Sequence, residues 1–173
     1  MTGAGDRGDT YLPGTGRVRK THPRVAAFGE VDELSSFIGL ARAALKYEEV
    51  DELLKTVQES LFHVGAYLAN PTHPVEKIRS NSLVVEEWVR LLESNLPPLR
   101  HFIYPAGCTE AVLMHVCRAV ARRAERAVAR VADEEPVDES ITAFLNRLST
   151  LFFLLAREMN RRAGVSEEEW RQS

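Results

Sequence analysis

Apolar residues recur every three or four positions in five stretches of the chain, and this pattern limits the fold more than any other feature. Such spacing places apolar side chains on one face of an α-helix. Pro23 suits the first turn of the first helix, and proline or glycine follows each of the last four. Hardly any segment alternates as a strand does, so the sequence predicts an all-α, up-and-down five-helix bundle. The expected helices span residues 23–45, 51–68, 83–96, 109–132 and 138–162.

The length fits one domain, since a chain of 173 residues can bury roughly 70% of its unfolded surface. Apolar residues make up 45% and charged residues 27%, a balance that excludes a disordered chain and is typical of a soluble globular protein. We expect a single domain over residues 1–173. Its parts are a flexible glycine-rich arm (1–22), the helix bundle (23–162) and a tail (163–173).

Composition also excludes several function classes. The longest strongly apolar run, 151–156, is far shorter than the roughly 20 residues that cross a bilayer, so no membrane span is expected. The first ten residues lack the apolar region of a secretory signal, which favours the cytoplasm. A net charge of −3 disfavours nucleic-acid binding. Cys108 and Cys117 have no partners at zinc-ligand spacing, so no metal site is expected.

The fifth helix is apolar on more than one side. Leu151, Phe153 and Leu154 lie outside its main apolar face, so the helix should be buried all round for two turns. Either a subunit interface or a central position within the monomer would bury it, and the sequence leaves both open.

The arm combines glycines with hydroxyl groups and a cation. Glycine lets the backbone approach a ligand closely, and Thr2, Thr10 and Lys20 could bind phosphate. A Walker P-loop is excluded, because Arg19 stands where its second glycine is required and no strand precedes it. The alternative is an unstructured terminus. The arm glycines are Gly3, Gly5, Gly8, Gly14 and Gly16.

Arginine recurs every fourth residue along the expected fourth helix. This arginine ladder consists of Arg118, Arg122, Arg126 and Arg130, and such like charges repel by about 0.2–0.5 kcal/mol per pair. The ladder therefore indicates an anionic partner, with a solvated face as the alternative. Asp32 could be a counter-ion or simply an exposed acid.

Asn146, His63 and His115 are further polar residues within the expected helices, and each allows a functional or an ordinary structural interpretation. Asn146 interrupts the fifth helix, where it either forms a hydrogen bond or lies at the surface. The histidines do not repeat the Glu-x-x-His spacing of di-iron bundles, so His63 and His115 are interpreted as ordinary helix residues.

The chain resembles the PduO-type ATP:cob(I)alamin (corrinoid) adenosyltransferases in five blocks over residues 2–160. The blocks are GDRGDT, RVAAFGEVDELSSFIGLA, FIYPAG, CRAVARRAER and FLNRLSTLFFLLAR. The resemblance implies a homotrimer of five-helix bundles in which ATP and corrinoid share sites between subunits. It also implies transfer of the 5′-deoxyadenosyl group of ATP to cob(I)alamin, with release of triphosphate. Mg²⁺ and a cob(II)alamin reductase are further implied partners.

Site residues follow from the same resemblance. Asp32 and Arg118 match an intersubunit acid–arginine pair, and Phe102 matches the aromatic residue that keeps the lower axial ligand away from cobalt. Arg122 and Arg126, with Lys20, are expected to stabilise the departing triphosphate. The ATP-binding matches are Thr2, Gly3, Ala4, Gly5, Asp9, Thr10, Lys20, Arg122, Arg123, Ala124, Glu125, Arg126 and Asn146.

The chain departs from the family pattern at two places. Ser35 stands where many members have asparagine, and Pro105–Gly107 reads Pro-Ala-Gly instead of the commoner Pro-Gly-Gly. A non-catalytic ATP or corrinoid carrier and a di-iron bundle are the alternative hypotheses.

Overall fold

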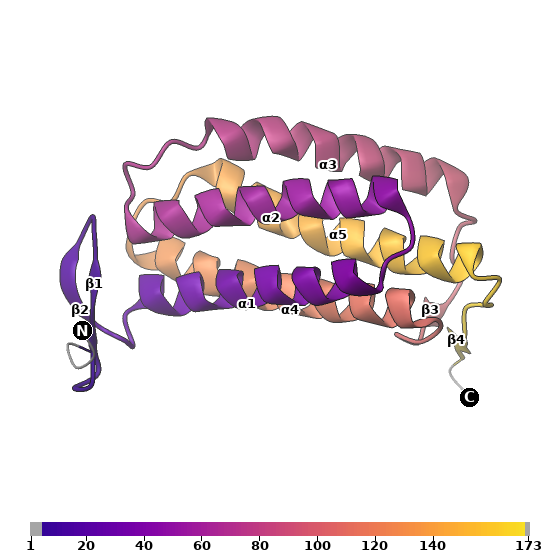
Figure 1. Cartoon of the computed structure of the whole chain (residues 1–173), viewed down its shortest axis with the longest axis horizontal. Helices are drawn as coiled ribbons and strands as arrows, with labels where there is room; N and C mark the ends of the chain where they lie inside the picture. The colour runs from indigo at the N-terminus through magenta and orange to yellow at the C-terminus, as the bar shows by residue number, and fades with distance from the viewer. Residues whose placement is uncertain (1–4, 172–173) are drawn as a thin grey trace.

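The computed structural model describes residues 5–171 and contains five long helices that run alternately up and down (Figure 1). Each helix packs against two others in the cyclic order α1–α2–α3–α5–α4, and the apolar core lies between them. The predicted five-helix bundle is thus confirmed. The helices are α1 (Pro23–Ala44), α2 (Glu48–Ala69), α3 (Glu76–Asn95), α4 (Thr109–Glu134) and α5 (Glu139–Arg162).

Helix α3 begins seven residues before the predicted start. Its first turns are polar, and Asn81 takes a core-facing position where the apolar pattern required an aliphatic residue. Asn81 is only 7% exposed, and its side-chain amide donates to the Ser60 hydroxyl of α2 at 3.0 Å. Because a buried polar pair replaces an apolar contact between α2 and α3, the apolar periodicity did not reveal the start of α3.

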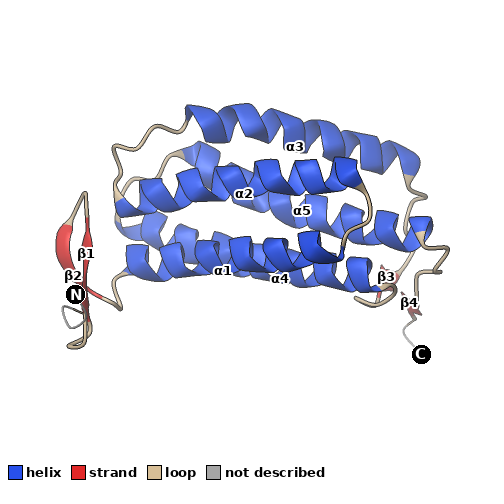
Figure 2. Ribbon diagram, viewed as in Figure 1, coloured by secondary structure: helices blue, strands red, loops and turns tan. Residues whose placement is uncertain are grey.

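The expectation of a loop-forming arm is wrong for residues 9–19, which form an antiparallel hairpin of β1 (Asp9–Leu12) and β2 (Gly16–Arg19) (Figure 2). The intervening turn closes with a hydrogen bond from Thr15 N to Leu12 O at 3.0 Å, and Gly16 has φ +93°. A three-residue hairpin loop needs glycine at that position. The turn residues thus form a hairpin where their composition suggested a loop.

The hairpin is tied to the end of α2. Gly14 N donates to Ala69 O at 3.1 Å, and a Cβ atom at Gly14 would lie 2.8 Å from Asn70 and Pro71. This close approach fixes the hairpin at one end of the bundle, beyond the start of α1 (Figure 1).

The apolar residues outside the main face of α5 are mostly covered within the chain itself. Leu151 has no exposed surface and Leu154 is 6% exposed, whereas Phe153 is half-buried. Packing of α5 against α3 and α4 therefore accounts for the burial of Leu151 and Leu154. The helix begins where Asp138 accepts a hydrogen bond from Ser140 N at 2.9 Å.

The segment after α5, which we expected to be a tail, includes a short strand. It contains β4 (Glu169–Trp170), which pairs with β3 (Phe102–Ile103) at the end of the bundle opposite the hairpin (Figure 1). Arg157 of α5 is buried, and its guanidinium donates hydrogen bonds to the Glu167 carboxylate at 2.7 Å and to Pro97 O at 2.7 Å. None of the described helices is long and apolar enough to cross a membrane.

Candidate functional site

The hairpin carries a cationic pocket of about 680 Å³. Asp9 lies within it and accepts hydrogen bonds from Arg17 at 2.8 Å and from Arg19 at 3.2 Å. The bond from Arg17 lowers the pKa of Asp9 against the opposing effect of burial, so the carboxylate stays charged. Within residues 5–171, neither Arg7 nor Lys20 pairs with an acid, which leaves both cations for an anionic ligand. The lining residues are Gly5, Arg7, Asp9, Thr10, Tyr11, Arg17 and Lys20.

The arginine ladder runs along α4 from the β3–β4 end toward the hairpin end. Arg122, Arg126 and Arg130 are exposed, and no carboxylate of the described chain forms an ion pair with any of the four arginines. Glu125 instead accepts a hydrogen bond from the Asn146 amide at 2.9 Å. Asn146 thus forms a hydrogen bond and also lies at the surface, so both alternatives for this residue hold. The bond brings two predicted ATP-binding residues together.

Two predicted ATP-binding residues lie away from the ladder. Arg123 forms ion pairs with Glu30 and Glu33 of α1, which raise its pKa, so its guanidinium braces α1 against α4. Ala124 has no exposed surface because its position on α4 faces the core. The buried side chain leaves only the backbone of Ala124 for a contact with ATP, and the predicted contact stays a prediction. Thr2, Gly3 and Ala4 lie outside the described residues.

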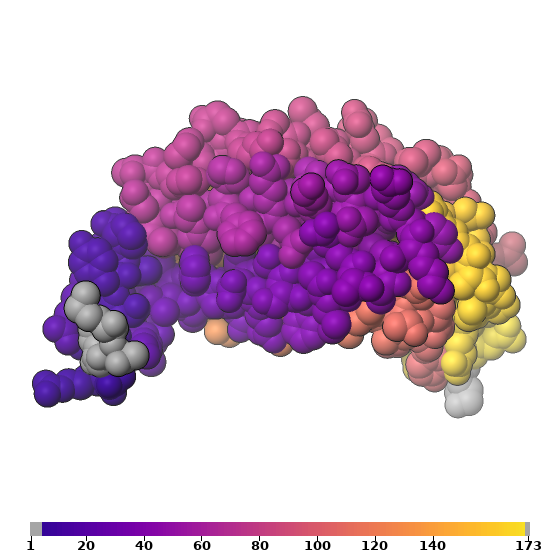
Figure 3. Space-filling view, viewed as in Figure 1, coloured from indigo at the N-terminus to yellow at the C-terminus, as the bar shows by residue number. Residues whose placement is uncertain are grey.

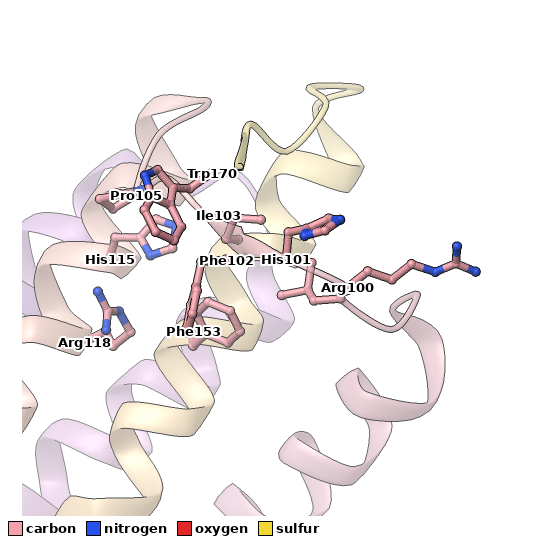
Figure 4. A pocket seen from close by; sticks show the side chains of 10 residues that line it. Arg100, His101, Phe102, Ile103, Pro105, His115, Arg118, Phe153 and Trp170 are labelled. Carbon is pink, nitrogen blue, oxygen red and sulfur yellow. The ribbon is translucent and has the colours of Figure 1, made fainter. Parts of the chain in front are cut away.

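A second cavity, of about 690 Å³, opens at the β3–β4 end (Figure 4). Phe102 is 79% exposed there, and its ring lies 6.3 Å from that of Trp170, centroid to centroid. Arg118, the first residue of the ladder, reaches the cavity from α4. The lining residues are Leu99, Arg100, His101, Phe102, Ile103, Pro105, His115, Arg118, Phe153 and Trp170.

Two buried polar groups beside this cavity lack hydrogen-bond partners. Both ring nitrogens of His115 and the Nε atom of Arg118 are unpaired within the described chain. Burial lowers the pKa of His115, and the neighbouring Arg118 lowers it further. His115 is thus a helix residue that is buried in the neutral form, and Arg118 has bonding capacity for a group outside the chain.

Asp32 is exposed on α1 and forms no ion pair with Arg118 within the described chain. It lies at a small apolar hollow together with Phe28, Ser35 and Phe62. The Ser35 backbone carbonyl accepts a hydrogen bond from Gln58 at 2.9 Å, a bond that does not depend on the side chain at this position. The Ser35 hydroxyl lies 3.5 Å from the same Gln58 nitrogen. A counter-ion role for Asp32 would require a second chain.

The loop between β3 and α4 depends on glycine at one position. Gly107 has φ +124°, and a Cβ atom there would lie 1.9 Å from the side-chain oxygen of Asn160. No residue other than glycine has positive φ among those described, so Ala106 has an ordinary backbone. The Pro-Ala-Gly sequence therefore keeps glycine where the loop requires it.

Comparison with known proteins shows the family of the chain. The family model for cobalamin adenosyltransferase matches residues 1–159. The chain belongs to this family. It is 39% identical to the corrinoid adenosyltransferase of Bacillus subtilis, over 99% of this chain and 92% of that protein. It is 38% identical to the cobalamin adenosyltransferase of Cupriavidus metallidurans, over 99% and 93% respectively.

Solved structures of the family have the same fold. One is a phenylalanine-to-alanine variant of the PduO-type ATP:corrinoid adenosyltransferase from Lactobacillus reuteri, complexed with cobalamin and ATP. It superposes with a TM-score of 0.92 and 32% identity, covering 99% of each chain. An arginine-to-lysine variant of that enzyme, complexed with ATP, has the same TM-score and identity.

Sequence reasoning missed several residues that line the two pockets or support them. Arg17 and Arg19 alternate as residues on a strand do, and recognising the strand could have placed both beside Asp9. Trp170 and Asn160 are isolated in a tail and at a helix end, and nothing in their spacing links them to Phe102 or Gly107. Only the folded chain brings these residues together.

Proposed function

We infer that the chain transfers the 5′-deoxyadenosyl group of ATP to the cobalt of cob(I)alamin and releases triphosphate. The supporting observation is that the family match over residues 1–159 includes the cationic hairpin pocket and all but Trp170 of the cavity that carries exposed aromatic side chains. The first suits a polyphosphate and the second an apolar macrocycle. We propose the cytoplasm as the location.

The two pockets support a site shared between chains. They lie at opposite ends of the bundle, separated by most of α4, whose 26 residues span about 39 Å. The hairpin at one end and the β3–β4 segment at the other extend past the lower edge of the bundle, and the surface between them is concave (Figure 3). A hairpin from a neighbouring chain could bring nucleotide to the ladder and the cavity. We propose a homotrimer in which Asp32 of one chain meets Arg118 of the next.

The arginines would act on the leaving group. In the proposed reaction cob(I)alamin is the nucleophile, its electron pair forms the bond to C5′, and the C5′–O bond breaks toward triphosphate. No proton is transferred, so no general base is required. Arg122, Arg126 and Lys20 would stabilise the charge that gathers on the triphosphate, and Glu125 with Asn146 would help to position the nucleotide.

The apolar end would prepare the corrinoid. Phe102 projects from β3, and we propose that it excludes the lower axial ligand of cobalt. Without that ligand, cob(II)alamin is easier to reduce to cob(I)alamin, and a separate reductase would supply the electron. The apolar walls around Phe102 would keep water from the reduced cobalt.

Mg²⁺ would enter with ATP. This ion usually keeps several waters and binds through substrate phosphates with one or two carboxylates. Within residues 5–171, no three His, Cys, Asp or Glu side chains gather as metal ligands. We propose that the phosphates of ATP supply most of the ligands of the ion.

The substitution Arg122→Ala tests this proposal. The change should lower kcat about 100-fold or more, because a charge-stabilising donor is lost. The assay follows the spectral change from chemically reduced cob(I)alamin to adenosylcobalamin with ATP, and gel filtration monitors assembly.

The matched control is Arg90→Ala, which removes an exposed arginine of α3 and should leave kcat unchanged. Full activity in Arg122→Ala would contradict the assigned role. Tight binding of ATP and corrinoid by the wild type without turnover would instead support the carrier hypothesis.

A further inference from the structure

Asn160 lies in the last turn of α5 with only 2% of its surface exposed. Its amide nitrogen donates to Ala106 O at 3.0 Å, and its side-chain oxygen accepts from Cys108 N at 3.0 Å. One side chain thus satisfies two backbone groups on either side of Gly107. A buried amide that is paired in this way holds a backbone in one conformation.

Gly107 completes the arrangement from the other side. The Asn160 amide occupies the space where any other residue would place its Cβ atom. The left-handed conformation of Gly107 and the position of Asn160 therefore depend on each other.

The backbone of Asn160 also holds the segment that leads to β4. Val165 N donates to Asn160 O at 2.9 Å, and Tyr104 N donates to Glu168 O at 2.9 Å. Beyond these bonds, Phe102 pairs with Trp170 across β3 and β4. Asn160 therefore contacts both chain segments that carry the aromatic residues of the cavity.

We propose that Asn160 is a positioning residue for the corrinoid site. Its side-chain amide fixes the β3–α4 loop. The loop adjoins β3 and is bonded to the last segment through Tyr104 N and Glu168 O, so the amide sets the position of Phe102 against Trp170 through the loop. Asn160 does not line the cavity and touches no substrate. This inference rests on the proposed function, in which the position of Phe102 decides the coordination of cobalt.

Three variants test the inference. Asn160→Asp keeps an acceptor for Cys108 N but loses the donor to Ala106 O, Asn160→Ala loses both bonds, and Gly107→Ala strains the same contact from the loop. Asn95→Asp is the matched control, because Asn95 is exposed at the end of α3. All four are assayed with ATP and cob(II)alamin in the presence of a reducing system, so that the turnover includes the reduction step, after their folding has been checked by circular dichroism.

The expected result is a kcat that is about 10- to 100-fold lower in the three variants, since small misplacements near reacting groups can cost that much. The KM for ATP should change less than about twofold, because neither Asn160 nor Gly107 contacts a predicted ATP-binding residue and distant sites usually act independently. Electron paramagnetic resonance of cob(II)alamin with ATP should show less of the four-coordinate form. Hydrogen exchange should rise at 104–108 and 168–170 but not at 9–19.

Folded Asn160 variants with wild-type kcat and an unchanged cob(II)alamin spectrum would overturn the inference, even if their Tm is lower. If the Asn160 variants do not fold, Gly107→Ala decides by the same readouts. Wild-type protein that forms no adenosylcobalamin would refute the proposed function instead. The exchange measurement would then still report whether Asn160 holds the loop.

Discussion

The two ends of the bundle build their pockets in opposite ways. At the hairpin end, charged side chains on two short strands surround an open pocket, and Asp9 is held by exposed arginines. At the other end, aromatic rings project from segments that buried polar residues of α5 hold in place. A polyphosphate needs charge and adaptable contacts, whereas a rigid macrocycle needs a surface that is already formed. The difference predicts that substitutions at the two ends change different kinetic constants.

Phe102→Ala should show the largest effect. Loss of the ring opens the cavity to water or a lower ligand, so kcat should fall about 100-fold, as expected when a group at the reacting centre is removed. The KM for ATP should stay the same. Steady-state assays with each substrate varied in turn measure both constants.

The control for Phe102→Ala is Leu91→Ala, which removes an exposed apolar side chain from the outer helix α3. A Phe102→Ala enzyme with a raised KM for ATP and an unchanged kcat would contradict the division between the two ends.

Lys20→Ala should act on the nucleotide with an intermediate effect. The loss of one charged contact to phosphate should raise the KM for ATP about tenfold, in line with roughly 1.5 kcal/mol for such a bond. The KM for the corrinoid should not change. Isothermal titration with ATP checks the same result without turnover.

Lys55→Ala, an exposed lysine of α2, is the control for this change in charge. Equal weakening of ATP binding in both variants would show that overall charge, rather than the hairpin pocket, attracts the nucleotide.

His115→Leu should show the smallest effect of the three substitutions, and the effect is on the pH dependence of the Tm. Burial and Arg118 lower the pKa of His115, so the unfolded chain, with a pKa of about 6.5, binds the proton more readily than the folded protein. Folding stability therefore decreases as the pH falls below about 6.5, until the lowered pKa is passed. The Tm difference between pH 7.5 and pH 5.5 should narrow in His115→Leu.

His101→Leu removes an exposed imidazole from the same cavity and should keep the wild-type Tm difference. The interpretation of His115 would be wrong if its removal left the pH dependence of the Tm unaltered.

Local sequence signals predicted the helices well, because Val31, Leu34 and Ile38 repeat with the helical period and all face the core. The same signals missed the first turns of α3, where Asn81 replaces an aliphatic residue. They also missed the hairpin, because glycine and proline suit both a turn and a loop. Periodicity reports only neighbours on one element, and β3 with β4 joins residues that are nearly 70 positions apart.

Resemblance to the family predicted more residues of the candidate site than residue spacing did. It could not distinguish residues whose side chains are free to contact a ligand from residues that pack within the bundle. It grouped Arg122, Arg123 and Ala124 together, although one is exposed, one is paired with α1 and one is buried. A helix turns by about 100° per residue, so adjacent positions face different surroundings. Side-chain direction therefore had to come from the structure.

The placement of the two pockets at opposite ends has a consequence for inheritance. In the proposed trimer each polypeptide would lend its hairpin to one catalytic centre and its cavity to another. In a trimer that mixes mutant and wild-type subunits, a mutant subunit with one damaged end would inactivate the centre to which that end contributes. Its intact end would still form an active centre with the other neighbouring subunit. Defects would be distributed around the ring rather than confined to the subunit that carries them.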